Sequence, residues 1–235
     1  FGQIKKGGIL VIIKKIKSLI ILVLQIPIYL LSIPTVIIIR LIRPWFLIRW
    51  QGIKSSRIGH FASETELYCC EIESGINKPK QNFIDLFYLA KKITCNKQLE
   101  KMWKRKIKIL PRFIMYPLFV FNRFLNNFFK GGDFHEIGTN TNQDRDVHNL
   151  LEKYHTHINF TQEEEDLGKK ILKKFSINID KFVCLNVRDS AYLDRHKEYT
   201  DSNWNYHNFR DGNIDLYALA AEELAKRGYH VFRMG

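Results

Sequence analysis

Acidic residues are absent from the first 63 positions of the chain, and the first one is Glu64. The same region contains ten basic residues, which account for most of the formal net charge of +13. Cations that flank a long apolar run are typical of segments attracted to anionic lipid headgroups, whereas nucleic-acid-binding domains spread them over a folded face. The sequence therefore predicts membrane lipid as a partner and argues against nucleic acid. The ten residues are Lys5, Lys6, Lys14, Lys15, Lys17, Arg40, Arg43, Arg49, Lys54 and Arg57.

Cysteine is also scarce. The chain has four cysteines, with neither a Cys-x-x-Cys motif nor the histidine spacing of a zinc site. One of them, Cys184, lies in a predicted buried strand. This usage is typical of reduced thiols in a cytoplasmic compartment. The hydrophobic share of 46% excludes a disordered protein.

Charged residues are missing again from the 22-residue stretch 18–39, which is long enough to cross a hydrocarbon core of about 30 Å as a helix. Pro27 and Pro34 interrupt this stretch, and each removes a backbone donor and favours a kink. Two arrangements are therefore open, a straight membrane span and a bent helix that lies in one leaflet. Because no small-residue cleavage site follows, a removable signal peptide is excluded.

After this membrane-associated segment, residues 1–43, the pattern over 44–130 is that of an α/β domain. A short apolar strand in "PWFLIRWQ" leads into a glycine-containing loop and a helix. A second strand, "NFIDLFYLA", and a basic helix, "NKQLEKMWKRK", follow. The aromatic stretch Phe113–Phe129 is predicted to be a helix, either of the core or of a membrane-facing surface. Residues 131–160 begin with a polar, glycine-bearing sequence and are interpreted as a linker.

A second domain is predicted over 161–235. It opens with a helix whose N-cap is Thr161, with glutamates in the first turn and lysines near the end. A buried strand at 181–187, a helix between Asn213 and Gly228, and a last strand, "YHVFRM", follow. This order is typical of a βαβ unit in a parallel sheet. Since the sequence begins with Phe1 and closes on a strand, we expect it to be a fragment of a longer protein.

The buried strand runs directly into Arg188 and Asp189, at the edge where open parallel sheets bind ligands. The connection from Arg188 to Gly212 is 25 residues long, and loops of that length are usually binding loops or lids. Its cations suit phosphates and its aromatic rings suit stacking. The other interpretation is an Arg188–Asp189 surface pair in an ordinary loop. The cations are Arg188, Arg195, His196, His207 and Arg210, and the rings are Tyr192, Tyr199, Trp204, Tyr206 and Phe209.

Four blocks, "SSRIGHFASETELY", "CLNVRDSAYL", "HNFRDGNIDLYALAAEELAKRGY" and "VFRMG", resemble glycosyltransferases of bacterial surface-polysaccharide gene clusters. More distantly they are similar to fucosyltransferase-like GT-B enzymes, in which a His-x-Arg at a strand end places arginine against the nucleotide diphosphate. Asn186 occupies the histidine position of that motif, so only Arg188 carries over.

This resemblance implies two Rossmann-like domains with a cleft between them, the second one truncated. The first domain would face the acceptor and the second would bind the nucleotide-sugar donor. No metal is expected, because fixed cations and helix N-termini can stabilise a leaving diphosphate. The residues predicted to bind the donor are Arg188, Asp189, Tyr192, His207, Arg210 and Arg233.

The loop "RIGHFASE", Arg57–Glu64, is the second candidate site. Gly59 is expected to permit a tight turn, while His60 and Glu64 suit a general base for an acceptor hydroxyl. A structural role for His60 is equally open. His155 and His157 in "YHTHINF" alternate as on a strand face and lack further ligands at a suitable spacing, so they are interpreted as structural.

Two functions are compatible with the sequence. The first is a membrane-associated glycosyltransferase, with its catalytic domain on the cytoplasmic side, that moves a sugar from a nucleotide-sugar donor to a polysaccharide or lipid-linked acceptor. The second is a non-catalytic, membrane-anchored binding or assembly protein with a degenerate sugar-nucleotide fold, as Asn186 suggests. The sequence leaves the donor sugar, acceptor and linkage open.

Overall fold

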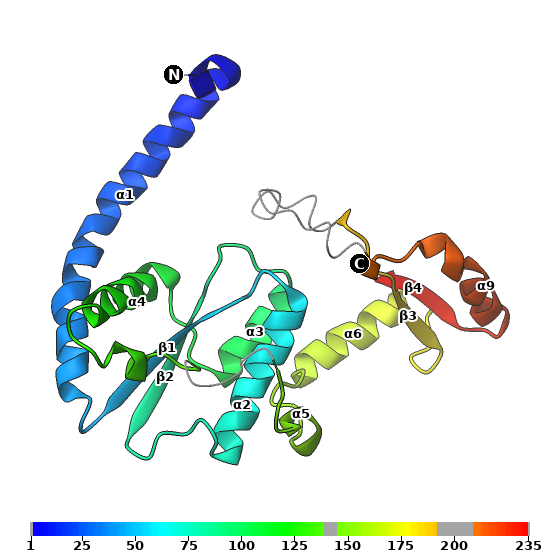
Figure 1. The fold of residues 1–235 in the computed structure, drawn as a ribbon. Helices are drawn as coiled ribbons and strands as arrows, with labels where there is room; N and C mark the ends of the chain where they lie inside the picture. The colour runs from blue at the N-terminus through cyan, green and yellow to red at the C-terminus, as the bar shows by residue number, and fades with distance from the viewer. Residues whose placement is uncertain (1, 139–144, 192–208, 235) are drawn as a thin grey trace. The chain divides into compact units, whose positions relative to one another are not determined.

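The computed structural model describes residues 2–138, 145–191 and 209–234 (Figure 1). The chain divides into two compact units, Phe1–Asn159 and Phe160–Gly235. Within the described residues it contains seven α-helices and two small parallel sheets. The predicted α/β class and the apolar N-terminal helix are therefore confirmed.

In the first unit, the parallel strands β1 and β2 form a sheet that is covered on both faces (Figure 1). Side chains alternate along each strand, so Phe87 packs with Phe61 and Trp103 on one face, while Tyr88 packs with Met115 on the other. Helices α2 and α3 cover the first face, and α1 and α4 cover the second. The bounds are β1 Leu47–Ile53, α2 Thr65–Ser74, β2 Phe83–Leu89, α3 Lys97–Lys106 and α4 Arg112–Asn126.

Helix α1 (Gly2–Ile42) continues through Pro27 and Pro34 as one helix. By length and composition its section Val23–Ile42 can cross a membrane. Near its C-terminal end the helix packs against the rest of the unit: Val36 is fully buried, and Ile39 packs with Met115 and Trp50. This end of the apolar helix is thus also part of the hydrophobic core.

Two basic residues that the sequence analysis counts among membrane-facing cations are used inside the first unit. Arg49 forms a buried ion pair with Asp85, its register partner on β2. The Arg40 guanidinium donates to Asn122 Oδ1 at 2.9 Å and to the Asn122 carbonyl at 2.7 Å. The charge available to lipid is accordingly smaller than the sequence count suggests.

Residues 131–160, interpreted from the sequence as a linker, contribute buried side chains to the first unit. A 3-10 turn at Gly132–His135 (η2) places His135 against Trp50, with stacked rings 5.5 Å apart. Ile137 joins the cluster of Phe61 and Phe87. The short helix α5, Leu150–Lys153, then packs on α2. The strand expected around His155 and His157 is not found in the described residues 154–160.

The second unit contains α6, β3, α9 and β4, with β3 and β4 parallel. Thr161 caps α6, as the sequence predicts, and the structure adds a complete capping box with Glu164. The predicted helix after Asn213 begins as a 3-10 turn, η4, and becomes α-helical at Ala218. It ends before Gly228, which has a φ of 85°. The bounds are α6 Gln162–Lys174, β3 Phe182–Asn186, η4 Ile214–Tyr217, α9 Ala218–Lys226 and β4 His230–Met234.

The prediction that β3 is buried is wrong. Cys184 and Asn186 are exposed, and the other three residues of the strand are half-buried. Its hydrophobic composition reflects contacts such as that of the Phe182 and Phe232 rings, whose centroids are 6.0 Å apart, rather than complete enclosure.

Candidate functional site

The carboxyl end of β1 leads into the first predicted site. Lys54 follows the strand, and the chain then forms a π-helical turn, His60–Glu64 (η1), before α2. His60 Nδ1 is hydrogen-bonded to Glu64 Oε1, and Lys54 Nζ lies 3.1 Å from the same oxygen. His60 and Glu64, which the sequence analysis pairs as a candidate base, are thus in contact.

The Glu64 carboxylate has the geometry to orient the His60 ring. In the tautomer whose Nδ1–H group donates a hydrogen bond to Glu64, the free lone pair is on Nε2, which is where a general base accepts a proton. Glu64 is largely shielded, while His60 remains about one-third exposed at 32% and Lys54 is more exposed still. This arrangement can accept a proton from a hydroxyl group that approaches the carboxyl end of the sheet.

The expectation that Gly59 permits a tight turn is wrong. Its φ of −60° and ψ of −53° are helical, and a Cβ at this position would meet no atom within 4 Å. Gly59 therefore continues the helical path, as does Arg57, whose carbonyl accepts from the Phe61 amide at 2.9 Å. The Arg57 side chain is half-buried and already interacts with another group of the protein.

The carboxyl ends of β3 and β4 carry the second predicted site. Arg188 Nε lies 3.5 Å from Asp211 Oδ1, and Arg233 Nη2 lies 3.2 Å from Asp189 Oδ2. Arg188 and Asp189 thus each have a partner elsewhere in the unit, Asp211 and Arg233 respectively. Three predicted donor-binding residues, Arg188, Asp189 and Arg233, are grouped here with Asp211.

Gly212 determines how closely the end of the long connection approaches β3. Its amide donates to the Arg188 carbonyl at 2.9 Å, and a Cβ on Gly212 would lie only 2.9 Å from Val187 Cγ1. A side chain at position 212 would crowd Val187, so glycine allows the chain to pass close to the end of β3. This close approach brings the preceding residue, Asp211, beside Arg188. The sequence analysis missed Asp211, although the Arg-Asp-Gly sequence at the end of the connection was a signal for it.

The remaining predicted donor residues are not part of this group. Arg210 is exposed, and its guanidinium carbon lies 5.3 Å from the centroid of the Phe209 ring. Tyr192 and His207 lie outside the described residues.

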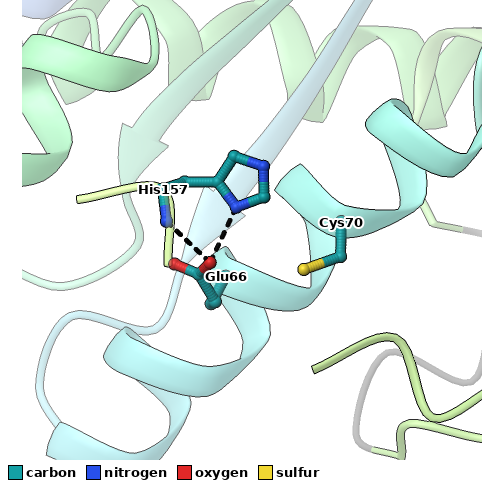
Figure 2. A group of neighbouring side chains, drawn as sticks. All are labelled: Glu66, Cys70 and His157. Atoms are coloured by element: carbon teal, nitrogen blue, oxygen red, sulfur yellow. Dashed lines mark hydrogen bonds and ion pairs between the residues drawn. The ribbon is translucent and has the colours of Figure 1, made fainter. Parts of the chain in front are cut away.

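A third cluster was not predicted from the sequence. Glu66 and Cys70 are four residues apart on α2 and share one face, and His157 approaches them from a distant part of the chain (Figure 2). Their possible ligand atoms all lie within 4.8 Å of one another. Nitrogen, sulfur and carboxylate oxygen are all donors that zinc accepts.

Hydrogen bonds already account for this cluster. His157 Nδ1 lies 2.7 Å from Glu66 Oε1, its backbone amide donates to the same oxygen, and Nε2 lies 2.8 Å from Glu73 Oε2. Burial, with the negative charge of Glu66, raises the pKa of the Cys70 thiol to about 11, so this sulfur stays protonated near neutral pH. The contacts therefore tie residues 154–160 to α2, in agreement with the structural role expected for His157.

The chain also contains an Asp-x-Asp sequence, Asp144–Asp146, which the sequence analysis overlooked. Asp144 lies outside the described residues. The two carboxylate oxygens of Asp146 accept from the backbone amides of Leu150 and Leu151 at 2.7 and 2.8 Å. Asp146 therefore caps α5, and the expectation of a metal-free reaction remains a prediction.

Comparison with known protein families, curated proteins and solved structures found no match to this chain.

Proposed function

We propose that this protein is a membrane-associated glycosyltransferase that moves a sugar from a nucleotide-sugar donor to a polysaccharide or lipid-linked acceptor. The observation that carries the proposal is the pair of arginines, Arg188 and Arg233, beside the carboxyl ends of two parallel strands. Ligands of open parallel sheets bind at this edge, and guanidinium groups suit the phosphates of a sugar-nucleotide diphosphate.

The partners of these arginines can be exchanged for a ligand. Arg188 and Asp211 are 3.5 Å apart and the Arg188 side chain is 37% exposed, whereas Arg49 and Asp85 are 2.7 Å apart and buried. Charge-assisted hydrogen bonds are normally about 2.7–2.9 Å long, so the Arg188 contact is loose. The Arg233–Asp189 pair is exposed, and exposed ion pairs contribute about 0–1 kcal/mol, so a more highly charged diphosphate can compete with it. Arg188 and Asp211 are less exposed, and Arg188 has a further interaction of its own.

In the proposed reaction the acceptor oxygen attacks the anomeric carbon, the bond from that carbon to the diphosphate breaks, and a general base takes up the hydroxyl proton. In the second unit, Arg188 and Arg233 stabilise the charge that accumulates on the leaving diphosphate. In the first unit, His60, oriented by Glu64, is the residue that suits the base. We expect no metal ion to be required, because fixed cations can stabilise the leaving diphosphate. We propose that the catalytic part of the protein lies on the cytoplasmic side of the membrane, as the cysteine usage of the sequence suggests.

The test is replacement of Arg188 in the full-length protein. Arg188→Ala should cost about 2–4 kcal/mol of transition-state stabilisation, a loss of roughly 30- to 1000-fold in sugar transfer, and should weaken binding of UDP or GDP in calorimetry. Arg188→Lys should recover only part of the loss, since lysine keeps the charge but not the planar fork. The matched control is Arg227→Ala, which removes an exposed, ion-paired arginine from the same unit. A folded Arg188→Ala protein with unchanged transfer would refute the proposal.

The non-catalytic alternative is favoured by one observation. Asn186, the last residue of β3, is exposed and cannot titrate or carry charge at the position where the related motif has histidine. A protein of this kind would bind the nucleotide diphosphate through Arg188 without transferring sugar. Nucleotide binding that is lost in Arg188→Ala, together with no transfer by the full-length wild-type protein, would favour this alternative.

A further inference from the structure

Helix α4 presents an apolar stripe that no described part of the chain covers. Phe113, Val120, Phe124 and Phe128, at positions i, i+7, i+11 and i+15, lie on one side of the helix and its C-terminal extension, and all four are exposed. The rings of Phe124 and Phe128 are 5.3 Å apart, so they form a continuous surface. We call these four residues the aromatic stripe.

The opposite side of α4 is fixed to α1. Ser32, Val36 and Ile39, at helical spacing on α1, are buried, and Ile39 packs with Met115 of α4. Arg40 adds hydrogen bonds to Asn122, and its Nη1 donates to the Phe129 carbonyl at 2.8 Å. If α1 is inserted in a membrane, the depth of its insertion therefore determines how close α4 lies to that membrane.

The length of the apolar run of α1, residues 18–39, places the contact between α1 and α4 at the membrane. The part of the run that precedes the α4 contact, residues 18–31, has 14 residues, which as a helix measure about 21 Å. A hydrocarbon core is about 30 Å thick, so this part alone is too short to cross it. The candidate span Val23–Ile42 is long enough, but it includes the section that packs on α4. Insertion of α1 therefore brings α4 to the bilayer.

The charge on α4 suits that location. The sequence of α4 contains two arginines and no acidic residue. Arg123 is ion-paired with Glu136, while Arg112 lies over the Tyr116 ring, 4.4 Å from its centroid, at the start of the helix. Lys130 follows the other end and is exposed. Cations at both ends of an apolar helix face are attracted by anionic headgroups.

From these observations we infer that α1 and α4 form a two-helix membrane anchor. Helix α4 lies in the plane of the bilayer surface, with the aromatic stripe in the outer hydrocarbon region and Arg112 and Lys130 among anionic headgroups. The aromatic stripe is thus covered by lipid, not by a second protein. This inference rests on the membrane association proposed above, but not on the donor site or on sugar transfer.

The test places a photo-crosslinking side chain in the stripe of the full chain. Phe124 is replaced by p-benzoylphenylalanine, an aromatic residue of related shape, and the protein is reconstituted in vesicles of phosphatidylcholine and phosphatidylglycerol. The same substitution at Leu24, exposed in the candidate span, is the positive control. Substitution at Phe175, an exposed phenylalanine of the second unit, is the matched negative control. Illumination is followed by mass spectrometry of the protein.

We expect lipid adducts at Phe124 and Leu24 and none above background at Phe175. Vesicles of phosphatidylcholine alone should reduce the adducts at Phe124 more than those at Leu24. Adducts at Leu24 without any at Phe124 would overturn the inference, and so would a protein adduct at Phe124 in place of lipid. Absence of adducts at both positions would refute the membrane location of α1 as well. Loss of nucleotide binding in Arg188→Ala would be unaffected by any of these results, so the two proposals fail separately.

Discussion

The ion pair between Arg49 and Asp85 provides a quantitative test of the first unit. The two residues lie opposite each other on β1 and β2, and the guanidinium makes two hydrogen bonds to the carboxylate, both 2.7 Å long. Arg49 also donates to Asn77 Oδ1 at 3.0 Å, and the Tyr68 hydroxyl donates to Asp85 Oδ2 at 2.7 Å. The side chains of Arg49 and Asp85 are only 7% and 5% exposed.

The burial of this ion pair determines the free-energy cost of removing either partner. Removal of one partner leaves the other charge buried and unpaired, which costs about 3–5 kcal/mol. Arg49→Met and Asp85→Asn should each lower the free energy of unfolding by that amount. The double variant should lose much less than the sum of the two, because it leaves no buried charge and the amide oxygen introduced by Asp85→Asn can still accept from Tyr68.

The assay is denaturant unfolding of the full chain in detergent, followed by tryptophan fluorescence, because the buried Trp50 adjoins Arg49 on β1. Midpoints are compared only between variants that share the same denaturant slope. An exposed pair in α9, Arg227 and Glu223, serves as the control cycle and should give a coupling below about 1 kcal/mol. The reasoning is refuted if Arg49→Met shifts the midpoint no more than Arg227→Met, or if the two single losses simply add.

Three further predictions concern other parts of the chain. Partial burial disfavours the charged form of Glu100, but hydrogen bonds from Lys104 and Lys97 outweigh it and lower its pKa from 4.5 to about 2. This stabilisation, about 1–2 kcal/mol after allowance for the exposed lysines, is therefore present above pH of about 4.5 and is lost as the pH falls towards 2. Glu100→Gln should remove this part of the pH dependence in acid-unfolding curves, and an unchanged profile would contradict the assignment. Maleimide should label the exposed Cys184 in the native protein, while the buried Cys69 and Cys70, whose pKa values burial raises to about 12 and 11, should react only after unfolding. Thr161→Ala should destabilise α6 by about 1 kcal/mol in thermal unfolding, and Thr161→Ser should not.

Elements with strong local signals could be predicted from the sequence. The N-cap of α6 at Thr161 and the strand around Phe87 depend on neighbouring residues, and both are confirmed. The extent of burial could not be predicted in the same way. Cys184 lies in a strand of hydrophobic composition, yet it is exposed, because burial depends on which other elements cover each face of the strand.

The roles of the basic residues were harder to predict, because their partners are distant in sequence. Arg49 pairs with a residue 36 positions away, and Arg40 with one 82 positions away. A count of charges along the chain therefore assigned both to the membrane surface. The cluster of His157, Glu66 and Glu73 was missed for the same reason, since only the folded chain brings these residues together.

The contrast between Arg49 and Arg188 shows why the candidate site needs three-dimensional information. Arg49 lies within a strand of a parallel sheet and Arg188 lies two residues beyond one, and both have an aspartate partner. The sequence does not show which of the two is enclosed. In the structure Arg49 is enclosed with a carboxylate at 2.7 Å, so a ligand could reach it only if the buried Asp85 were left unpaired, at a cost of several kcal/mol. Arg188 is more than one-third exposed and its Asp211 partner is 3.5 Å away, so its environment is more open to solvent than that of Arg49. The same residue type is therefore enclosed in the fold at one strand and partly open to solvent beyond the other, which is the difference on which the proposed donor site depends.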